Sequence, residues 1–135
     1  MESKNNKNVE ILIVDDNQMV SLATSAMLGS INNFNIIGMV TGANEMFNFL
    51  KTKTPNIILM DVSMGPIDGV EATEYIKKNY ENVSVIGFSA HDSSDYKDQM
   101  IGAGAIDYLL KSNTLPEIVK CINKVLKNEL GISTY

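Results

Sequence analysis

Two short apolar runs in this 135-residue chain end abruptly in acidic residues. Residues 11–14 (Ile-Leu-Ile-Val) run into Asp15-Asp16, and residues 57–60 (Ile-Ile-Leu-Met) run into Asp61. Uninterrupted apolar runs of this length are typical of parallel strands that are buried on both faces. Open sheets of parallel strands bind their ligands at the carboxyl ends of the strands. We therefore expect the three carboxylates to meet at one edge of a sheet.

Strand and helix patterns alternate along the chain. We expect strands at 9–14, 35–40, 56–61, 83–88 and 106–110, each followed by a helix. Five such units predict an α/β fold, a doubly wound five-stranded parallel sheet with helices on both faces. The flavodoxin-like order 2-1-3-4-5 has its switch point between the first and third strands. Those strands end in Asp15-Asp16 and Asp61, so topology and chemistry indicate the same site.

Local signals place the helices. Thr41 is the expected cap of the second helix, and Thr114 with Glu117 has the spacing of a capping box for the fifth. Gly102 and Gly104 each cost about 1 kcal/mol relative to alanine inside a helix, so the fourth helix should be the least secure. Gly131 is the expected end of the fifth helix. The first helix, about 18–28, is predicted from the helical spacing of its apolar residues Met19, Leu22, Ala23, Ala26 and Met27.

Composition excludes several classes of protein. The net charge of −5 argues against a nucleic-acid surface. The single cysteine, Cys121, rules out a disulfide within the chain, fits a reducing cytoplasm, and is expected to be a small apolar filler. No apolar run is long enough to span a membrane. We expect one domain at 9–130, between a disordered polar tail (1–8) and a C-terminal tail (131–135).

Two further polar residues belong to the same edge of the predicted sheet, Ser89 after the fourth strand and Lys111 after the fifth. Three adjacent carboxylates repel one another and cannot all stay ionised without a cation. Mg²⁺ suits such oxygen ligands, with Mn²⁺ as a possible substitute. The metal and Lys111 would together balance the three negative charges, which leaves a site that can receive a phosphoryl group.

The chain resembles the receiver domain of two-component response regulators over about residues 9–129. The matching residues are Asp15-Asp16, Asp61, Met64, Asp68-Gly69, Ser89-Ala90, Tyr108 and Lys111. The resemblance implies that a partner histidine kinase phosphorylates Asp61, and that Lys111 contacts the phosphoryl group. It also implies that the three aspartates and the backbone carbonyl of Ser63 hold Mg²⁺. Ser89 and Tyr108 would change position on activation and relay the state to the helix 4–strand 5–helix 5 surface.

This sequence departs from the family pattern at several places. Gly65 stands where a proline usually follows the methionine, with Pro66 one residue later, so this loop should be more mobile. Asp107 replaces a frequent glycine, and Ser112 replaces a frequent proline after the lysine. Ser112 together with the Tyr-Leu-Leu-Lys run at 108–111 resembles the pattern of receivers that precede LuxR-type helix-turn-helix domains. A stand-alone receiver and a fragment of a longer DNA-binding regulator both stay open, and the implied partners are a sensor kinase, an output domain or protein, and a possible homodimer.

The sequence thus predicts a cytoplasmic, phosphorylation-activated switch that modifies itself and is not a turnover enzyme. Three alternative functions compete with this one. A haloacid-dehalogenase-like phosphatase needs a second aspartate two residues after the nucleophile, where this chain has Ser63. A flavodoxin-like binding module needs a phosphate loop after the first strand, where Asp15-Asp16 would repel phosphate. A receiver-like adaptor that is never phosphorylated is disfavoured, because every phosphorylation residue is present.

Overall fold

The computed structural model describes residues 8–130, apart from the side chains of residues 129 and 130. Five strands alternate with five helices, and the last helix continues into one π-helical turn. The elements are β1 (Val9–Val14), α1 (Gln18–Gly29), β2 (Phe34–Val40), α2 (Ala43–Leu50), β3 (Ile57–Met60), α3 (Gly69–Asn79), β4 (Ser84–Ser89), α4 (Ser94–Ala103), β5 (Asp107–Leu110), α5 (Leu115–Val125) and the π-turn Leu126–Leu130.

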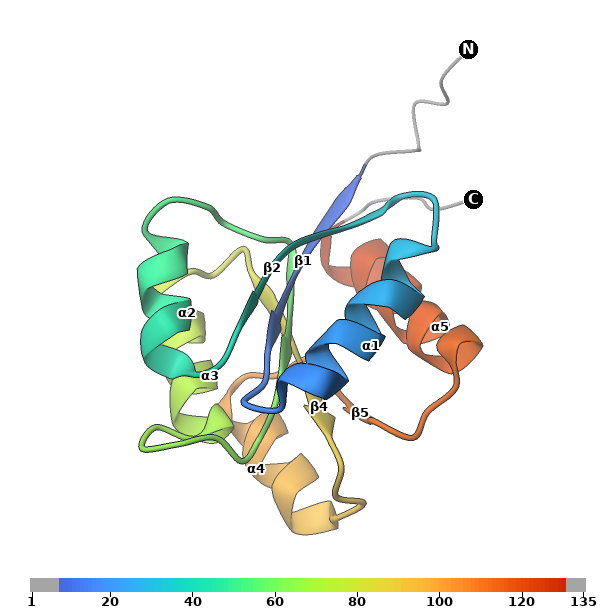
Figure 1. Cartoon of the computed structure of the whole chain (residues 1–135). Coiled ribbons are helices and arrows are strands. Elements are labelled where there is room, and N and C mark those ends of the chain that lie inside the picture. Colours follow the sequence, from blue (N-terminus) through green and yellow to red (C-terminus); the bar gives the residue numbers. More distant parts are fainter. Residues whose placement is uncertain (1–7, 131–135) are drawn as a thin grey trace.

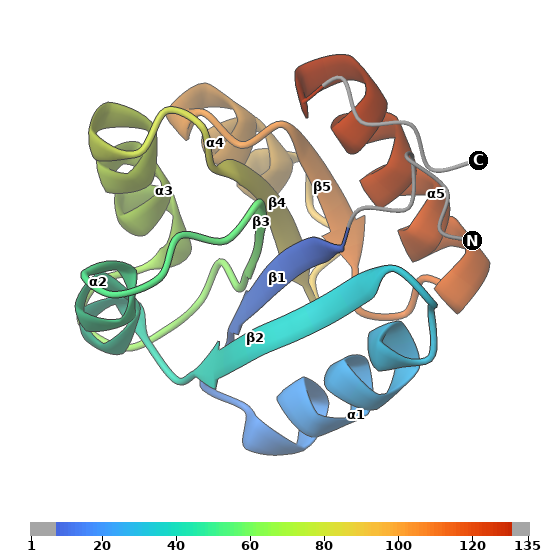
Figure 2. The same ribbon diagram turned by 90° about the horizontal axis from the view of Figure 1, so that it is seen from above.

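All four strand pairs are parallel, and the sheet order is β2-β1-β3-β4-β5. The predicted topology is therefore confirmed, and strand boundaries differ from the prediction by no more than one residue. Helices α1 and α5 cover one face of the sheet, while α2, α3 and α4 cover the other (Figures 1 and 2). The result is a three-layer sandwich of the flavodoxin-like type.

Successive side chains of the central strands point to opposite faces of the sheet, and so contribute alternately to two apolar layers. Ile11 and Ile13 belong to the cluster that packs with α1 and α5, whereas Leu12 and Val14 belong to the cluster under α2, α3 and α4. Every residue of β3 is buried, as expected for a strand covered on both faces. Cys121 is buried in the α1–α5 cluster, which confirms the predicted filler role.

The apolar spacing in α1 predicted the helix but not its buried face. Met19 is 75% exposed and Leu22 is 56% exposed, and the helix buries Ser21, Thr24 and Leu28 instead. Small residues such as serine and threonine can line a close helix–sheet contact as well as alanine can. The long side chains of Met19 and Leu22 consequently lie on the outer surface of the molecule.

One predicted cap is wrong and one is confirmed. The N-cap residue of α2 is Gly42, and no side chain caps this helix; Thr41 instead donates its N–H and hydroxyl to Glu45, at 2.6 and 2.8 Å. At α5 both hydrogen bonds of the Thr114–Glu117 capping box are present. The expected tails at 1–8 and 131–135, and the expected helix end at Gly131, fall outside the described residues except for Asn8.

Candidate functional site

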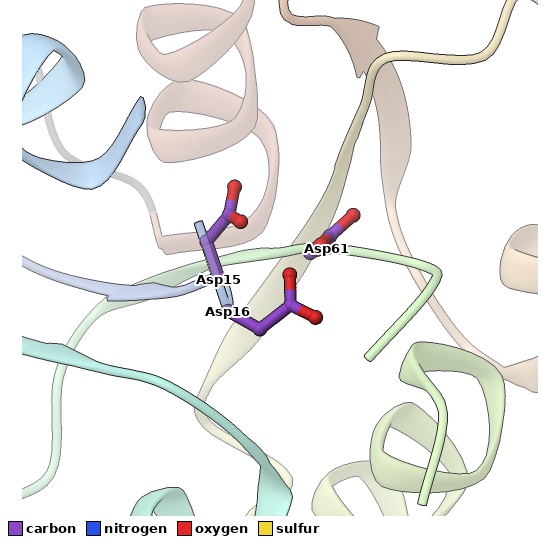
Figure 3. Close-up of side chains that lie close together, drawn as sticks. All are labelled: Asp15, Asp16 and Asp61. Atoms are coloured by element: carbon purple, nitrogen blue, oxygen red, sulfur yellow. The ribbon is translucent and has the colours of Figure 1, made fainter. Parts of the chain in front are cut away.

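Three aspartates meet at the carboxyl edge of the sheet (Figure 3). Asp15 and Asp16 follow β1, and Asp61 follows β3. Main-chain hydrogen bonds fix both positions, because the Asp15 N–H donates to the Val40 carbonyl and the Asp61 N–H donates to the Val14 carbonyl. One carboxylate oxygen of each aspartate lies within 4.8 Å of the others. The structure thus brings together the three acids that the sequence placed at this edge.

The three carboxylates differ in burial and in partners. Asp15 and Asp61 are buried, while Asp16 is exposed. Burial first, and then the charge of Asp15, raises the pKa of Asp61 to about 6, although Lys111 and an N–H from Ser63 oppose the rise. Asp61 is therefore a carboxylate whose charge is only partly compensated by the protein itself.

Lys111 reaches this cluster from the end of β5. The main-chain N–H of Lys111 donates to the Ser89 carbonyl, which holds this residue against the end of β4. The ammonium Nζ lies 2.6 Å from Asp15 Oδ2 and 3.6 Å from Asp61 Oδ1. The ion pair to Asp15 is thus the shorter one, although the family resemblance implies that Lys111 contacts a phosphoryl group on Asp61.

The donor set fits a hard divalent cation. Asp15 Oδ1 accepts the Asn17 N–H at 2.9 Å, but the buried Oδ2 accepts no well-aligned hydrogen bond in the described part of the chain. A buried carboxylate oxygen in that state, beside two further carboxylates, offers the oxygen ligands that Mg²⁺ prefers. The three aspartates therefore form an acidic pocket suited to Mg²⁺.

The loop between β3 and α3 borders the site. Asp68 caps α3 by accepting the Glu71 N–H, and Met64 is buried beneath the loop. Gly65 has a φ of 35°, in the left-handed region that suits glycine. A cavity of about 240 Å³ between this loop and α4 adjoins Asp16, and Tyr96 lines its far side. The site is thus open to solvent along the α4 side.

The two predicted switch residues share one main-chain partner. Ser89 is fully buried at the end of β4, and its Oγ accepts the His91 N–H at 3.0 Å. The Tyr108 hydroxyl donates to the His91 carbonyl at 2.8 Å. Sequence reasoning missed His91 and Asn17, because both act through main-chain groups that every residue except proline carries.

The Tyr108 ring has its place because Gly87 lacks a side chain. Gly87 and Tyr108 are register partners on β4 and β5. A Cβ on Gly87 would come within 2.7 Å of Tyr108 Cδ1 and 3.4 Å of Met100 Cε. The aromatic ring therefore lies directly across the β4 backbone, close to the fully buried Met100 of α4.

Comparison with known proteins identifies the family. The model of the response regulator receiver domain matches residues 11–123, and the chain belongs to this family. It is 31% identical over 121 residues to the transcriptional regulatory protein LiaR of Bacillus subtilis, and 29% identical over 121 residues to the response regulator protein VraR of Staphylococcus saprophyticus. Each alignment covers 90% of this chain, which spans 57% of LiaR and 58% of VraR.

Solved structures with a similar fold also belong to response regulators. The signal receiver domain of NarL from Mycobacterium tuberculosis superposes with a TM-score of 0.83 at 26% identity, covering 90% of this chain and 98% of that one. Membership of the family supports a phosphorylation-dependent signalling switch, and receiver domains bind Mg²⁺ at an acidic pocket of this kind. Among the described residues, no helix combines the length and the apolar character that crossing a membrane requires.

Proposed function

We propose that this chain is a switch in which Asp61 accepts a phosphoryl group from the phosphohistidine of a sensor histidine kinase. The position of Asp61 carries the proposal. It is a buried carboxylate at the tip of a central strand, 3.6 Å from an ammonium and close to two further carboxylates. Family membership supports the same assignment.

The transfer is a displacement at phosphorus. A carboxylate oxygen of Asp61 attacks, the new P–O bond forms as the donor P–N bond breaks, and the bonding electron pair leaves with the imidazole. Lys111 places its positive charge beside the equatorial oxygens. The three aspartates and the Ser63 carbonyl would hold Mg²⁺, which supplies further positive charge to those oxygens when bound.

Ser89 and Tyr108 are proposed to relay the phosphorylated state. The Ser89 hydroxyl can donate to a phosphoryl oxygen while its Oγ still accepts the His91 N–H. Movement of Ser89 then shifts residue 91, whose carbonyl holds the Tyr108 hydroxyl. The local event would reach the α4–β5–α5 surface through this loop, because α4 begins only three residues after His91.

The partners form part of the proposal. The solved structures that share this fold include two described as LuxR-family response regulators, one of them from Staphylococcus aureus with a TM-score of 0.80. A sensor kinase upstream, an output domain or protein downstream, and a homodimer are the corresponding partners proposed for this chain. The proposed activity is self-modification followed by slow autodephosphorylation, without turnover of an external substrate.

Phosphorylation by a small donor tests the assignment. Incubation with acetyl phosphate and Mg²⁺ should add one phosphoryl mass to the parent protein and none to Asp61→Asn. Asp98→Asn, a matched change at an exposed position of α4, should be labelled like the parent. Labelling of Asp61→Asn would refute Asp61 as acceptor. Catalytic hydrolysis of p-nitrophenyl phosphate by the parent would instead favour a phosphatase.

A further inference from the structure

Lys111 pairs with the wrong carboxylate for its proposed role. An ammonium that serves a phosphoryl group on Asp61 should lie nearest Asp61, yet the Nζ–Asp15 distance is 2.6 Å and the Nζ–Asp61 distance is 3.6 Å. The Lys111 side chain is 16% exposed and that of Asp15 is 2% exposed, so solvent screens the short pair only weakly. The preference for Asp15 is therefore a property of the buried site.

Asp15 explains this preference. One of its oxygens is engaged by the Asn17 N–H, but the other accepts no well-aligned hydrogen bond among the described residues. Leaving a buried ionised oxygen without compensation is costly, and the ammonium of Lys111 provides the missing charge. Asp61 likewise accepts one main-chain N–H, from Ser63, and is left with the ammonium at the longer distance of 3.6 Å.

Asp15 Oδ2 is also a natural ligand for a divalent cation. The Lys111 ammonium and the metal ion would therefore bind to the same oxygen. We propose that Lys111 competes with the divalent cation for Asp15, and that cation binding moves the ammonium from Asp15 to Asp61. This inference rests on the metal site of the proposed function. Lysine suits the exchange, because its ammonium is a point charge on a flexible stem and can shift without losing a fixed fork geometry.

The exchange would give Lys111 two successive positions. Without a divalent cation, Lys111 neutralises Asp15 and stabilises the site. With the cation bound, repulsion and the loss of Asp15 drive the ammonium toward Asp61, where the phosphoryl oxygens arrive. Cation binding would thus position Lys111 for the transfer, and Lys111 would in turn set the apparent affinity for the cation.

Titration with MgCl₂ in the absence of any phosphodonor tests the competition. Calorimetry should give a dissociation constant at least about tenfold lower for Lys111→Met than for the parent, because a positive charge has left the site. Lys97→Met removes an exposed lysine of α4 with the same change in net charge, and should stay within about twofold of the parent. Lys111→Gln provides a second, polar variant if Lys111→Met folds poorly. An unchanged or weaker affinity in the folded variant would overturn the competition.

Movement of the ammonium needs its own readout, because simple repulsion would also tighten binding in Lys111→Met. In the parent with ¹³C-labelled lysine, the Lys111 Cε–Hε resonance is identified by its absence from Lys111→Met. We expect it to shift during the titration with the same midpoint as the amide of Asn17, which reports on Asp15. A shift at Asn17 with an unmoved Lys111 resonance would overturn the exchange.

The result separates this inference from the proposed function. If both resonances shift but acetyl phosphate does not label Asp61, then the phosphoacceptor assignment falls while the exchange stands. If Asp61 is labelled but Lys111 does not move, then the exchange alone falls. A parent protein that binds no Mg²⁺ overturns the exchange and the metal site together.

Discussion

The Tyr108 hydroxyl donates a hydrogen bond to the main-chain carbonyl of His91, with 2.8 Å between the two oxygens. His91 in turn donates its main-chain N–H to Ser89 Oγ. The loop between β4 and α4 is therefore held from both sides, by a buried strand end and by an aromatic side chain of β5. This arrangement gives the proposed relay a physical route that can be interrupted at either end.

Replacing Tyr108 by phenylalanine interrupts the relay at β5. Tyr108→Phe removes one neutral hydrogen bond, a loss of about 0.5–1.5 kcal/mol. We expect amide hydrogen exchange of residues 90–93 to become about two- to tenfold faster, with Asp61 still phosphorylated by acetyl phosphate. Tyr75→Phe is the matched control, because it removes a hydroxyl from α3, where the Tyr75 ring packs against Phe47 and Tyr80. Unchanged exchange in Tyr108→Phe would show that this hydrogen bond does not hold the loop.

Replacing Ser89 by alanine interrupts the relay at β4. A hydrogen bond to a charged phosphoryl oxygen contributes about 1.5–3 kcal/mol, which shifts a two-state equilibrium roughly tenfold to a hundredfold. Ser89→Ala should still be phosphorylated, more slowly, yet show little response over residues 93–108. The measurement is amide hydrogen exchange with and without beryllofluoride as a phosphoryl mimic. A full response in Ser89→Ala, or none in the parent, would exclude this route.

The fold and the meeting of the acids could be predicted because both follow from strand order. Parallel strands place their carboxyl ends together, so residues 46 positions apart, such as Asp15 and Asp61, meet once the order 2-1-3-4-5 is known. The capping box at Thr114 was equally accessible, since its two hydrogen bonds depend only on local spacing.

The remaining features depend on contacts for which sequence has no local signal. The buried face of α1 could not be read from hydrophobicity, because Ser21 and Thr24 pack inward while Met19 stays exposed. Main-chain contacts such as those of His91 can be made by almost any residue. The choice of Lys111 between two carboxylates depends on about one ångström, which is below what spacing along a chain can resolve.

Mg²⁺ should stabilise the folded protein. A ligand that binds only the folded state adds RT ln(1 + [L]/Kd), which is about 2.7 kcal/mol at 100 times Kd. The check is the melting temperature with and without saturating MgCl₂. Asp16→Asn should reduce the increase, because it removes one carboxylate of the cluster, whereas the exposed Asp98→Asn should retain it. An unchanged midpoint in the parent would exclude a metal site here.

The raised pKa of Asp61 predicts a pH dependence for the metal-free protein. Burial raises this pKa to about 6, above its value in the unfolded chain, so the folded state favours the protonated form. The stabilising contribution is fully present below pH 4 or so, and is lost as the pH rises through about 6. The parent should lose up to about 2–3 kcal/mol relative to Asp61→Asn across this interval.

Thermal melting in EDTA at several pH values measures this difference. Subtracting the Asp61→Asn curve removes the contributions of the acids outside this cluster. Saturating Mg²⁺ should flatten the difference, because a bound cation favours the carboxylate form. Parallel curves for the two proteins in EDTA would contradict the proposed charge state of Asp61.

Gly69 provides a stability test that also concerns the site, because it begins α3 directly against the Asp61 peptide. A Cβ at this position would overlap the Asp61 carbonyl oxygen and the Cα of Val62, and both belong to the backbone. Neither atom can yield as a flexible side chain would, so Gly69→Ala must displace the segment that carries the phosphoacceptor. We expect a destabilisation of at least about 1–3 kcal/mol, as for overpacking in a core.

The matched control lies in α4, where a Cβ on Gly102 would meet nothing within 4 Å. Gly102→Ala should stabilise the protein by about 0.5–1 kcal/mol, because alanine loses less conformational entropy in a helix. Urea unfolding of both variants measures the two changes, which should have opposite signs. A Gly69→Ala protein as stable as the parent would mean that the Asp61 peptide can move aside, and its rate of labelling by acetyl phosphate would then show whether the carboxylate depends on that rigid support.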